Sequence, residues 1–187
     1  MEDVARRRGM LRTLWERATR WGVELAAEAP PEPVIVRYCA PVCEAERLLA
    51  GVFHPDLYER AKDGGTPQAV IRIYRSPAPH PTDAPCLGGD REDLSYDLVT
   101  LAHECGHAMS YQRRGESWAR YFASACKRDR GESLTAGDQA LILEEERAAW
   151  EHGRSLLVAV GESDFTTFER LREAGLRQHA ENMAGAK

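Results

Sequence analysis

The chain has 187 residues, of which 43% are hydrophobic and 29% are charged, and its formal net charge at pH 7 is −5. This length and composition are typical of one globular domain with its own core, and they exclude a disordered or fibrous protein. The negative charge argues against general affinity for a phosphate backbone, so we expect no nucleic-acid partner.

The first predicted element is an N-terminal helix. Apolar residues recur at helical spacing over Val4–Glu28, and Pro30 follows and ends the pattern. The basic run Arg6–Arg8 lies within this helix. We interpret it as a solvated helix face and not as a nucleic-acid patch, because a short run of charges on a helix is usually solvated.

Two stretches predict a small β-sheet. Residues 34–39 and 68–75 are rich in β-branched side chains and lie near prolines or glycines, and we expect them to pair. Short helices are expected near 42–50 and 55–61. The segment 76–89 is too rich in proline for a helix or a central strand, so it is predicted to be a surface loop.

The second half of the chain is predicted to be almost entirely helical. Helical patterns cover four segments: 91–113, 116–128, 136–160 and 163–183. Thr135 and Ser163 stand where the N-caps of the last two helices belong, and Asp90 or Asp93 can cap the first.

Together these elements predict a single α+β domain that is mainly helical. An N-terminal helix and small sheet would occupy 1–88, and a helical portion would occupy 89–187. The N-terminus has no apolar segment behind its charges, and no run of about eighteen apolar residues occurs, so we expect a soluble, cytoplasmic protein without a membrane partner.

The five cysteines are expected to be reduced thiols. They are odd in number and lack paired spacing, which supports neither a disulfide framework nor a cysteine-rich zinc site. Cys105 is predicted to be a small core residue. Cys86 precedes the motif helix, where a thiolate could reach a metal and hold the protein latent, but the simpler interpretation is an ordinary loop cysteine.

The predicted helix at 91–113 contains the motif His103-Glu104-x-x-His107. Residues four apart lie one turn apart on the same face, so both imidazoles can point at a single ion. Glu104 can take a proton from a zinc-activated water without binding the metal itself. The plainer alternative is two helix histidines without a ligand. An apolar stripe predicts that this helix packs in the core: Leu94, Leu98, Leu101, Ala102, Cys105 and Met109.

A catalytic zinc site usually has three protein ligands, so another helix should supply the third. Three consecutive glutamates begin at Glu144. Helical spacing from Ile142 makes Glu146 the only charged residue of an otherwise apolar stripe. A lone carboxylate there is costly unless it is paired, and a metal would pair it. We therefore predict Glu146 as the ligand, Glu145 as the alternative, and Glu144 as exposed.

Two small residues, Ala149 and Gly153, share the stripe of Glu146. Small side chains let helix backbones approach closely, as they do where membrane helices pack. The glutamate helix is therefore expected to press directly on the motif helix.

The run Val99-Thr-Leu-Ala-His-Glu-Cys-Gly-His107, followed by Glu146-x-x-Ala149-Trp150, resembles the gluzincin metallopeptidases. More narrowly, it is similar to the small ImmA/IrrE-type and minigluzincin-like enzymes, and the resemblance covers roughly 69–160. A metzincin is excluded because its continuation needs glycine and histidine where this chain has Ser110 and Arg113.

The resemblance implies a small zincin-like domain in which a short β-sheet lies next to the motif helix. It also implies one Zn²⁺ per chain, held by His103, His107 and Glu146. An edge strand at 69–75 would hold an extended peptide or protein substrate by β-augmentation.

The sequence departs from that family at Trp150, where Asp or Asn often accepts a hydrogen bond from a ligand histidine. Tryptophan is a donor only. The acceptor would then be a backbone carbonyl, Asp97 or Asp138.

The expected function is a zinc-dependent metallopeptidase, an endopeptidase, in which Glu104 is the general base and then protonates the leaving amine. Tyr111, Tyr121 and His152 are candidates for a second oxyanion donor besides zinc. The alternative is a non-catalytic zincin-fold protein that binds zinc structurally or recognises a partner.

The other histidines, His54, His80 and His179, have no partner at ligand spacing, and we interpret them as surface residues.

Overall fold

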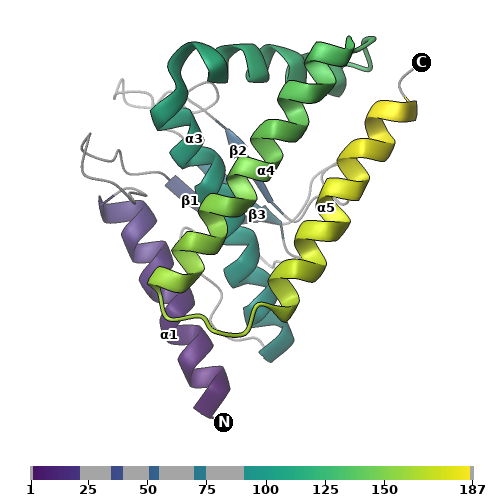
Figure 1. Cartoon of the computed structure of the whole chain (residues 1–187). Helices are drawn as coiled ribbons and strands as arrows, with labels where there is room; N and C mark the ends of the chain where they lie inside the picture. Colours follow the sequence, from purple (N-terminus) through teal and green to yellow (C-terminus); the bar gives the residue numbers. More distant parts are fainter. Residues whose placement is uncertain (1, 22–34, 40–50, 55–69, 75–90, 186–187) are drawn as a thin grey trace.

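The structure is a computed structural model that describes residues 2–21, 35–39, 51–54, 70–74 and 91–185. This part of the chain is mainly helical and carries one three-stranded sheet, with the strands lying behind the long helices in the view of Figure 1.

Some predicted features lie outside the described residues: the helices near 42–50 and 55–61, the loop at 76–89, Cys86, His80 and the cap Asp90. No helix within the described ranges combines the length and the apolar character that crossing a membrane requires.

Helix α1 spans Glu2–Glu16 and continues as a π-helical turn, η1, at Arg17–Trp21. Leu11, Leu14 and Ala18 are fully buried, as the helical spacing of apolar residues predicts. Helix α1 packs against α3, the helix that carries the motif, so this apolar face becomes part of the common core.

The sheet has the strand order β1-β3-β2. Strand β1 (Ile35–Cys39) runs parallel to β3 (Val70–Tyr74), which confirms the predicted pairing of these two segments. Strand β2 (Gly51–His54) pairs antiparallel with the other side of β3. The prediction that 69–75 forms an edge strand is therefore wrong. A strand of four residues gives little sequence signal, and for that reason β2 was missed.

Helix α3 spans Arg91–Asp129 and contacts β2, β3 and α4. The sequence predicted two helices separated near 114–115, but α3 is continuous there, and Figure 1 shows that its C-terminal part changes direction. A glycine inside a helix costs only about 1 kcal/mol relative to alanine, which tertiary packing readily offsets. Gly115 therefore does not end the helix.

Helix α4 spans Ala136–Ala159 and runs antiparallel to the first part of α3 (Figure 1). Thr135 is its N-cap, as predicted, and forms a reciprocal capping box with Asp138. Asp138 also accepts hydrogen bonds from Ser124 at 2.7 Å and Lys127 at 3.1 Å on α3. This carboxylate therefore caps one helix and ties it to another, and it is not the predicted acceptor for a ligand histidine.

Helix α5 spans Thr166–Gly185 and begins three residues later than predicted, so Ser163 is not its N-cap. The backbone N–H groups of Ser163 and Asp164 donate to the side chain of Glu162 at 2.8 and 2.9 Å. The carboxylate of Asp164 in turn accepts from the N–H of Thr166 at 3.1 Å. Acidic side chains before the helix thus order the turn between α4 and α5.

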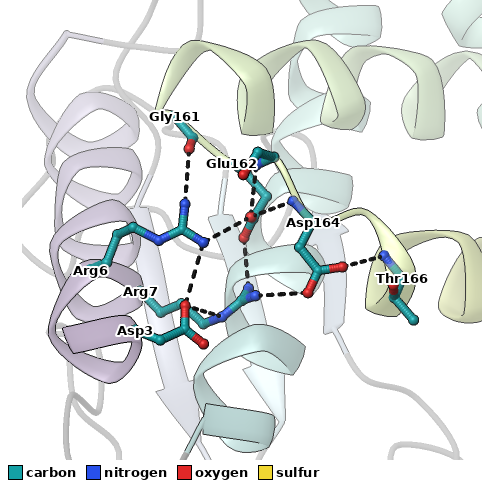
Figure 2. A network of polar contacts seen from close by, with 8 residues as sticks. Asp3, Arg6, Arg7, Gly161, Glu162, Asp164 and Thr166 are labelled. Carbon is teal, nitrogen blue, oxygen red and sulfur yellow. Dashed lines mark hydrogen bonds and ion pairs between the residues drawn. The ribbon is translucent and has the colours of Figure 1, made fainter. Parts of the chain in front are cut away.

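Arg7 anchors α1 to that turn (Figure 2). Its Nη1 donates to Glu162 at 2.6 Å and its Nη2 to Asp164 at 3.3 Å. Both Arg7 and Glu162 are buried. The prediction that Arg6–Arg8 form a solvated face is therefore wrong at Arg7. A buried charge is tolerated when it is paired and hydrogen-bonded, as Glu162 is here.

Replacing Arg7 with methionine would leave the buried carboxylate of Glu162 without its cation. We expect the free energy of unfolding to fall by about 3–5 kcal/mol, the usual effect of breaking a buried ion pair. Denaturant unfolding followed by circular dichroism measures it. Arg8→Met, on the exposed side of the same helix, is the matched control, with a change below about 0.5 kcal/mol. Equal stability of the two variants would contradict the anchoring role of Arg7.

The hydrogen bonds of Asp138 should make the folding stability of the protein depend on pH in acid. Hydrogen bonds from Ser124, Thr135 and Lys127 hold the pKa of Asp138 well below its usual range. Its contribution to stability is therefore complete above the ordinary carboxylate pKa of about 4 and is lost as pH falls through the lower folded-state pKa. The native protein should be more stable than Asp138→Asn at pH 7, and the gap should narrow in acid. A gap that is constant across a denaturation series from pH 7 to strong acid would contradict this assignment.

Candidate metal centre

Three predicted ligands come together where α3 and α4 cross. Donor atoms of His103, His107 and Glu146 all lie within 4.8 Å of one another. The Oε2 atom of Glu146 is 3.6 Å from Nε2 of His103 and 3.5 Å from Nε2 of His107. The side chains of His107 and Glu146 are buried, and that of His103 retains 13% of its exposure. The motif histidines and the downstream glutamate thus converge on one point.

The spacing of these atoms suits a shared ion better than direct hydrogen bonds. Donor–acceptor distances in N–H···O hydrogen bonds are about 2.7–3.2 Å, shorter than both contacts of Glu146. Two ligands that each lie about 2.0–2.1 Å from a tetrahedral zinc ion are about 3.3–3.4 Å apart. Glu146 Oε2 is buried and accepts no hydrogen bond from any described residue. Two imidazoles and a carboxylate therefore suit Zn²⁺ in chemistry, and the two contacts of Glu146 are close to the ligand–ligand distance that zinc requires.

Two glycines allow the helices to approach closely enough for this convergence. A Cβ atom on Gly106 of α3 would lie 2.0 Å from the carbonyl oxygen of Ala149 on α4. A Cβ atom on Gly153 of α4 would lie 2.9 Å from the carbonyl oxygen of Ala102 on α3. The close approach of the two helices expected from Ala149 and Gly153 is confirmed. On the motif helix, the missing side chain of Gly106 makes room for the backbone of Ala149.

Glu145 lies on the opposite side of His107 from the three-donor cluster. Its Oε1 is 3.6 Å from Nδ1 of His107, whereas Nε2 of the same ring faces Glu146. Ligand histidines usually present their second nitrogen to a carboxylate or carbonyl, which fixes the ring's tautomer and orientation. At 3.6 Å this contact is an ion pair and not a hydrogen bond, and it places Glu145 on the side of His107 where the sequence suggested Asp97 or Asp138. The burial of Glu145 was not predicted, since its helical face contains polar residues.

His103 is held by Trp150 of α4. The two rings stack with centroids 4.0 Å apart and an interplanar angle of 19°. Helix α5 closes the other side of the indole, where a Cβ on Gly175 would lie 3.4 Å from Cζ2 of Trp150. Stacking against Trp150 therefore restricts the orientation of the His103 ring.

The clustered side chains shift one another's pKa values. Burial and the neighbouring His107 lower the pKa of His103 to about 3. Burial also acts to lower the pKa of His107, but the carboxylates of Glu146 and Glu145 outweigh it and raise that pKa to about 10. Burial opposes ionisation of Glu146, yet the nearby histidines keep its pKa well below the usual range. Histidines bind a metal in the neutral form, so metal binding would release the proton that the two carboxylates hold on His107.

Glu104 is buried next to His103 but is not one of the three clustered donors. Its charge contributes to raising the pKa values of His107 and Tyr121, so its carboxylate lies near the cluster. The role of Glu104 as a general base stays a prediction. Cys105, beside it, is fully buried, and burial raises the pKa of its thiol far above the ordinary value, as expected of a core residue.

Of the three proposed oxyanion donors, Tyr121 has the most direct link to the cluster. Its ring lies parallel to His107 with centroids 6.4 Å apart. Burial, and then the charge of Glu146, raise its pKa well above the ordinary value, so the hydroxyl stays protonated. Tyr111 contacts Trp118 edge-on at 5.6 Å, and His152 lies partly buried on α4.

The sequence interpretation of His179 as a surface residue is wrong, because its side chain is only 25% exposed and contacts two other helices. Its Nε2 lies 3.3 Å from Oε1 of Glu146, and its Nδ1 lies 3.1 Å from Nη1 of Arg128. No spacing in the sequence links α5 to the motif, so only the tertiary fold reveals this contact. One turn further along α5, Met183 is buried, which is consistent with a side of α5 that faces the other helices.

Comparisons with protein-family models, with curated proteins and with solved structures find no match to this chain. The geometry of the site is therefore the basis for assigning a function to this chain.

The helix crossing generates a stability prediction. Gly106→Ala would place a methyl group against backbone, which cannot move aside as a side chain can. We expect it to destabilise the protein by more than the 1–3 kcal/mol typical of overpacking, and Gly153→Ala by about that amount. Gly137→Ala, also on α4, is the control, because its nearest neighbouring atom would be 3.7 Å away. Thermal unfolding of the three variants measures this, and equal melting temperatures would contradict the close crossing.

Proposed function

We propose that this chain is a zinc-dependent metallopeptidase of the gluzincin type, with a zincin-like domain and one Zn²⁺ held by His103, His107 and Glu146. The observation that carries the proposal is the convergence of the three donors, with Glu104 beside them and outside the cluster. Structural zinc sites generally have four protein ligands, whereas catalytic sites have three and an open position. Among the residues that the structure describes, the cluster has three donors, which matches the catalytic pattern.

When bound, the zinc ion supplies Lewis acidity and activates a water for attack on a peptide carbonyl. Glu104 accepts the proton that this water loses and delivers it to the leaving amine, so one carboxylate acts as base and then as acid. Glu145 holds His107, and Trp150 holds His103, in the orientation that ligation needs. Tyr121 donates its hydroxyl proton in a hydrogen bond to the oxygen that gains charge.

The arrangement of the sheet suggests where an extended peptide binds. Strand β3 is paired on both sides, so among the described strands the edges belong to β1 and β2. Strand β2 also contacts α3, the helix that carries the motif. A peptide that adds, by main-chain hydrogen bonds, to the edge of β2 that pairs with no described strand would run beside that helix. We propose a cytoplasmic peptidase, similar to the ImmA/IrrE-type and minigluzincin-like enzymes, that cleaves peptide or protein substrates in this way.

Glu104→Gln tests the mechanism. The substitution keeps the size of the side chain but removes the base, so zinc content should stay near that of the native protein while peptidase turnover falls by about 10²–10⁴-fold or more. Elemental analysis and cleavage of a mixed fluorescence-quenched peptide library give the two readouts. Glu144→Gln is the matched control, because Glu144 is exposed on α4 and should leave both values unchanged.

Undiminished turnover in Glu104→Gln would contradict the role of Glu104. A native protein that binds one zinc ion and cleaves nothing in the library would favour the non-catalytic zinc-binding alternative.

A further inference from the structure

The two oxygens of Glu146 face different partners. Oε2 lies toward the Nε2 atoms of both motif histidines, at 3.6 and 3.5 Å. Oε1 lies 3.3 Å from Nε2 of His179 on α5. A carboxylate that can rotate offers a metal one oxygen, the other, or both. The contact with His179 restricts this freedom, because it engages Oε1 while Oε2 lies against the motif histidines.

Arg128 selects the form of His179 that can make this contact. Arginine carries only donors, so at 3.1 Å its Nη1 must donate to Nδ1 of His179. A neutral imidazole that accepts at Nδ1 carries its proton on Nε2. That proton faces Oε1 of Glu146. Arg128, His179 and Glu146 come from α3, α5 and α4, so the chain of contacts joins three helices at the metal centre.

We propose that His179 is a positioning residue for the zinc ligand Glu146. Its Nε2–H holds Oε1, so that Oε2 alone is presented to the metal, and Arg128 fixes the tautomer that permits this. The inference rests on the proposed zinc site but not on peptidase activity. It assigns to the C-terminal helix a part in metal binding that the motif does not contain.

His179 acts through Glu146 and is not itself a fourth ligand. The donors that lie mutually within 4.8 Å are those of His103, His107 and Glu146, and His179 is outside this group. Four protein ligands would also close the position that a catalytic zinc site needs for water. The partner arrangement resembles that of Glu145 and His107, in which a second side chain orients a ligand from behind.

The test measures metal affinity and the coordination geometry of the bound metal. If His179 only helped the protein to fold, a folded variant would keep both. Zinc affinity is determined by competition with a chromogenic chelator, and the visible absorption of the Co²⁺-loaded protein reports on coordination geometry. Loss of an outer partner typically weakens metal binding about 10–100-fold, and we expect this for His179→Ala. His179→Gln retains a donor of similar reach and should restore most of the affinity.

Arg128→Met should weaken binding in the same direction, because the tautomer of His179 is then no longer fixed. Gln178→Ala is the matched control, since Gln178 is exposed beside His179 on α5. His179→Ala should also alter the Co²⁺ absorption spectrum, as Glu146 becomes free to ligate through both oxygens. Circular dichroism of the metal-free variants verifies that each is folded.

Native-like zinc affinity and Co²⁺ spectrum in a folded His179→Ala variant would overturn the inference and leave the zinc site standing. Equal weakening in His179→Ala and His179→Gln would also overturn it, because packing and not the hydrogen bond would then matter. A native protein without zinc affinity would overturn the proposed function together with this inference. Zinc affinity without turnover would overturn the peptidase alone.

Discussion

The close crossing of α3 and α4 is the constraint on which the rest of the site depends. At Gly106 and Gly153 each helix presses its surface against a backbone carbonyl of the other, with no room for a side chain between them. Only at that separation can Glu146, on a short side chain, reach both motif histidines. The sheet, α1 and α5 surround this pair, and the ion pair of Arg7 and Glu162 fixes α1 to the turn that follows α4.

The same crossing buries an unusual concentration of charge. Glu104, Glu145 and Glu146 are all buried around His107. Burial of ionised carboxylates is expensive unless cations or hydrogen bonds compensate them. Among the described contacts, histidines compensate part of this negative charge. The carboxylates raise the pKa of His107, which favours its positively charged form. A divalent cation among these groups would compensate much more of the negative charge. The charge distribution thus supports the proposed metal centre independently of the motif that first suggested it.

The sequence predicted those parts of the molecule that depend on local pattern. The core stripe of the motif helix, the N-cap Thr135 and the pairing of β1 with β3 follow from periodicity and capping chemistry, and the structure confirms them. Contacts between distant segments were missed or wrong. Strand β2 pairs with the second side of β3. Arg7 donates a hydrogen bond to Glu162, which lies 155 residues away in the sequence, and His179 on α5 contacts Glu146. Each depends on tertiary packing, which no local pattern encodes.

The central claim is that α3 and α4 together build one zinc site, and metal content tests it most directly. Elemental analysis of the desalted native protein should give close to one zinc per chain after purification or reconstitution. Glu146→Ala, which removes the only ligand from α4, should lose most of it, whereas Glu145→Ala should retain zinc with weakened affinity. A native protein that holds no zinc after reconstitution, or a Glu146→Ala variant that binds it as tightly as the native chain, would contradict the account.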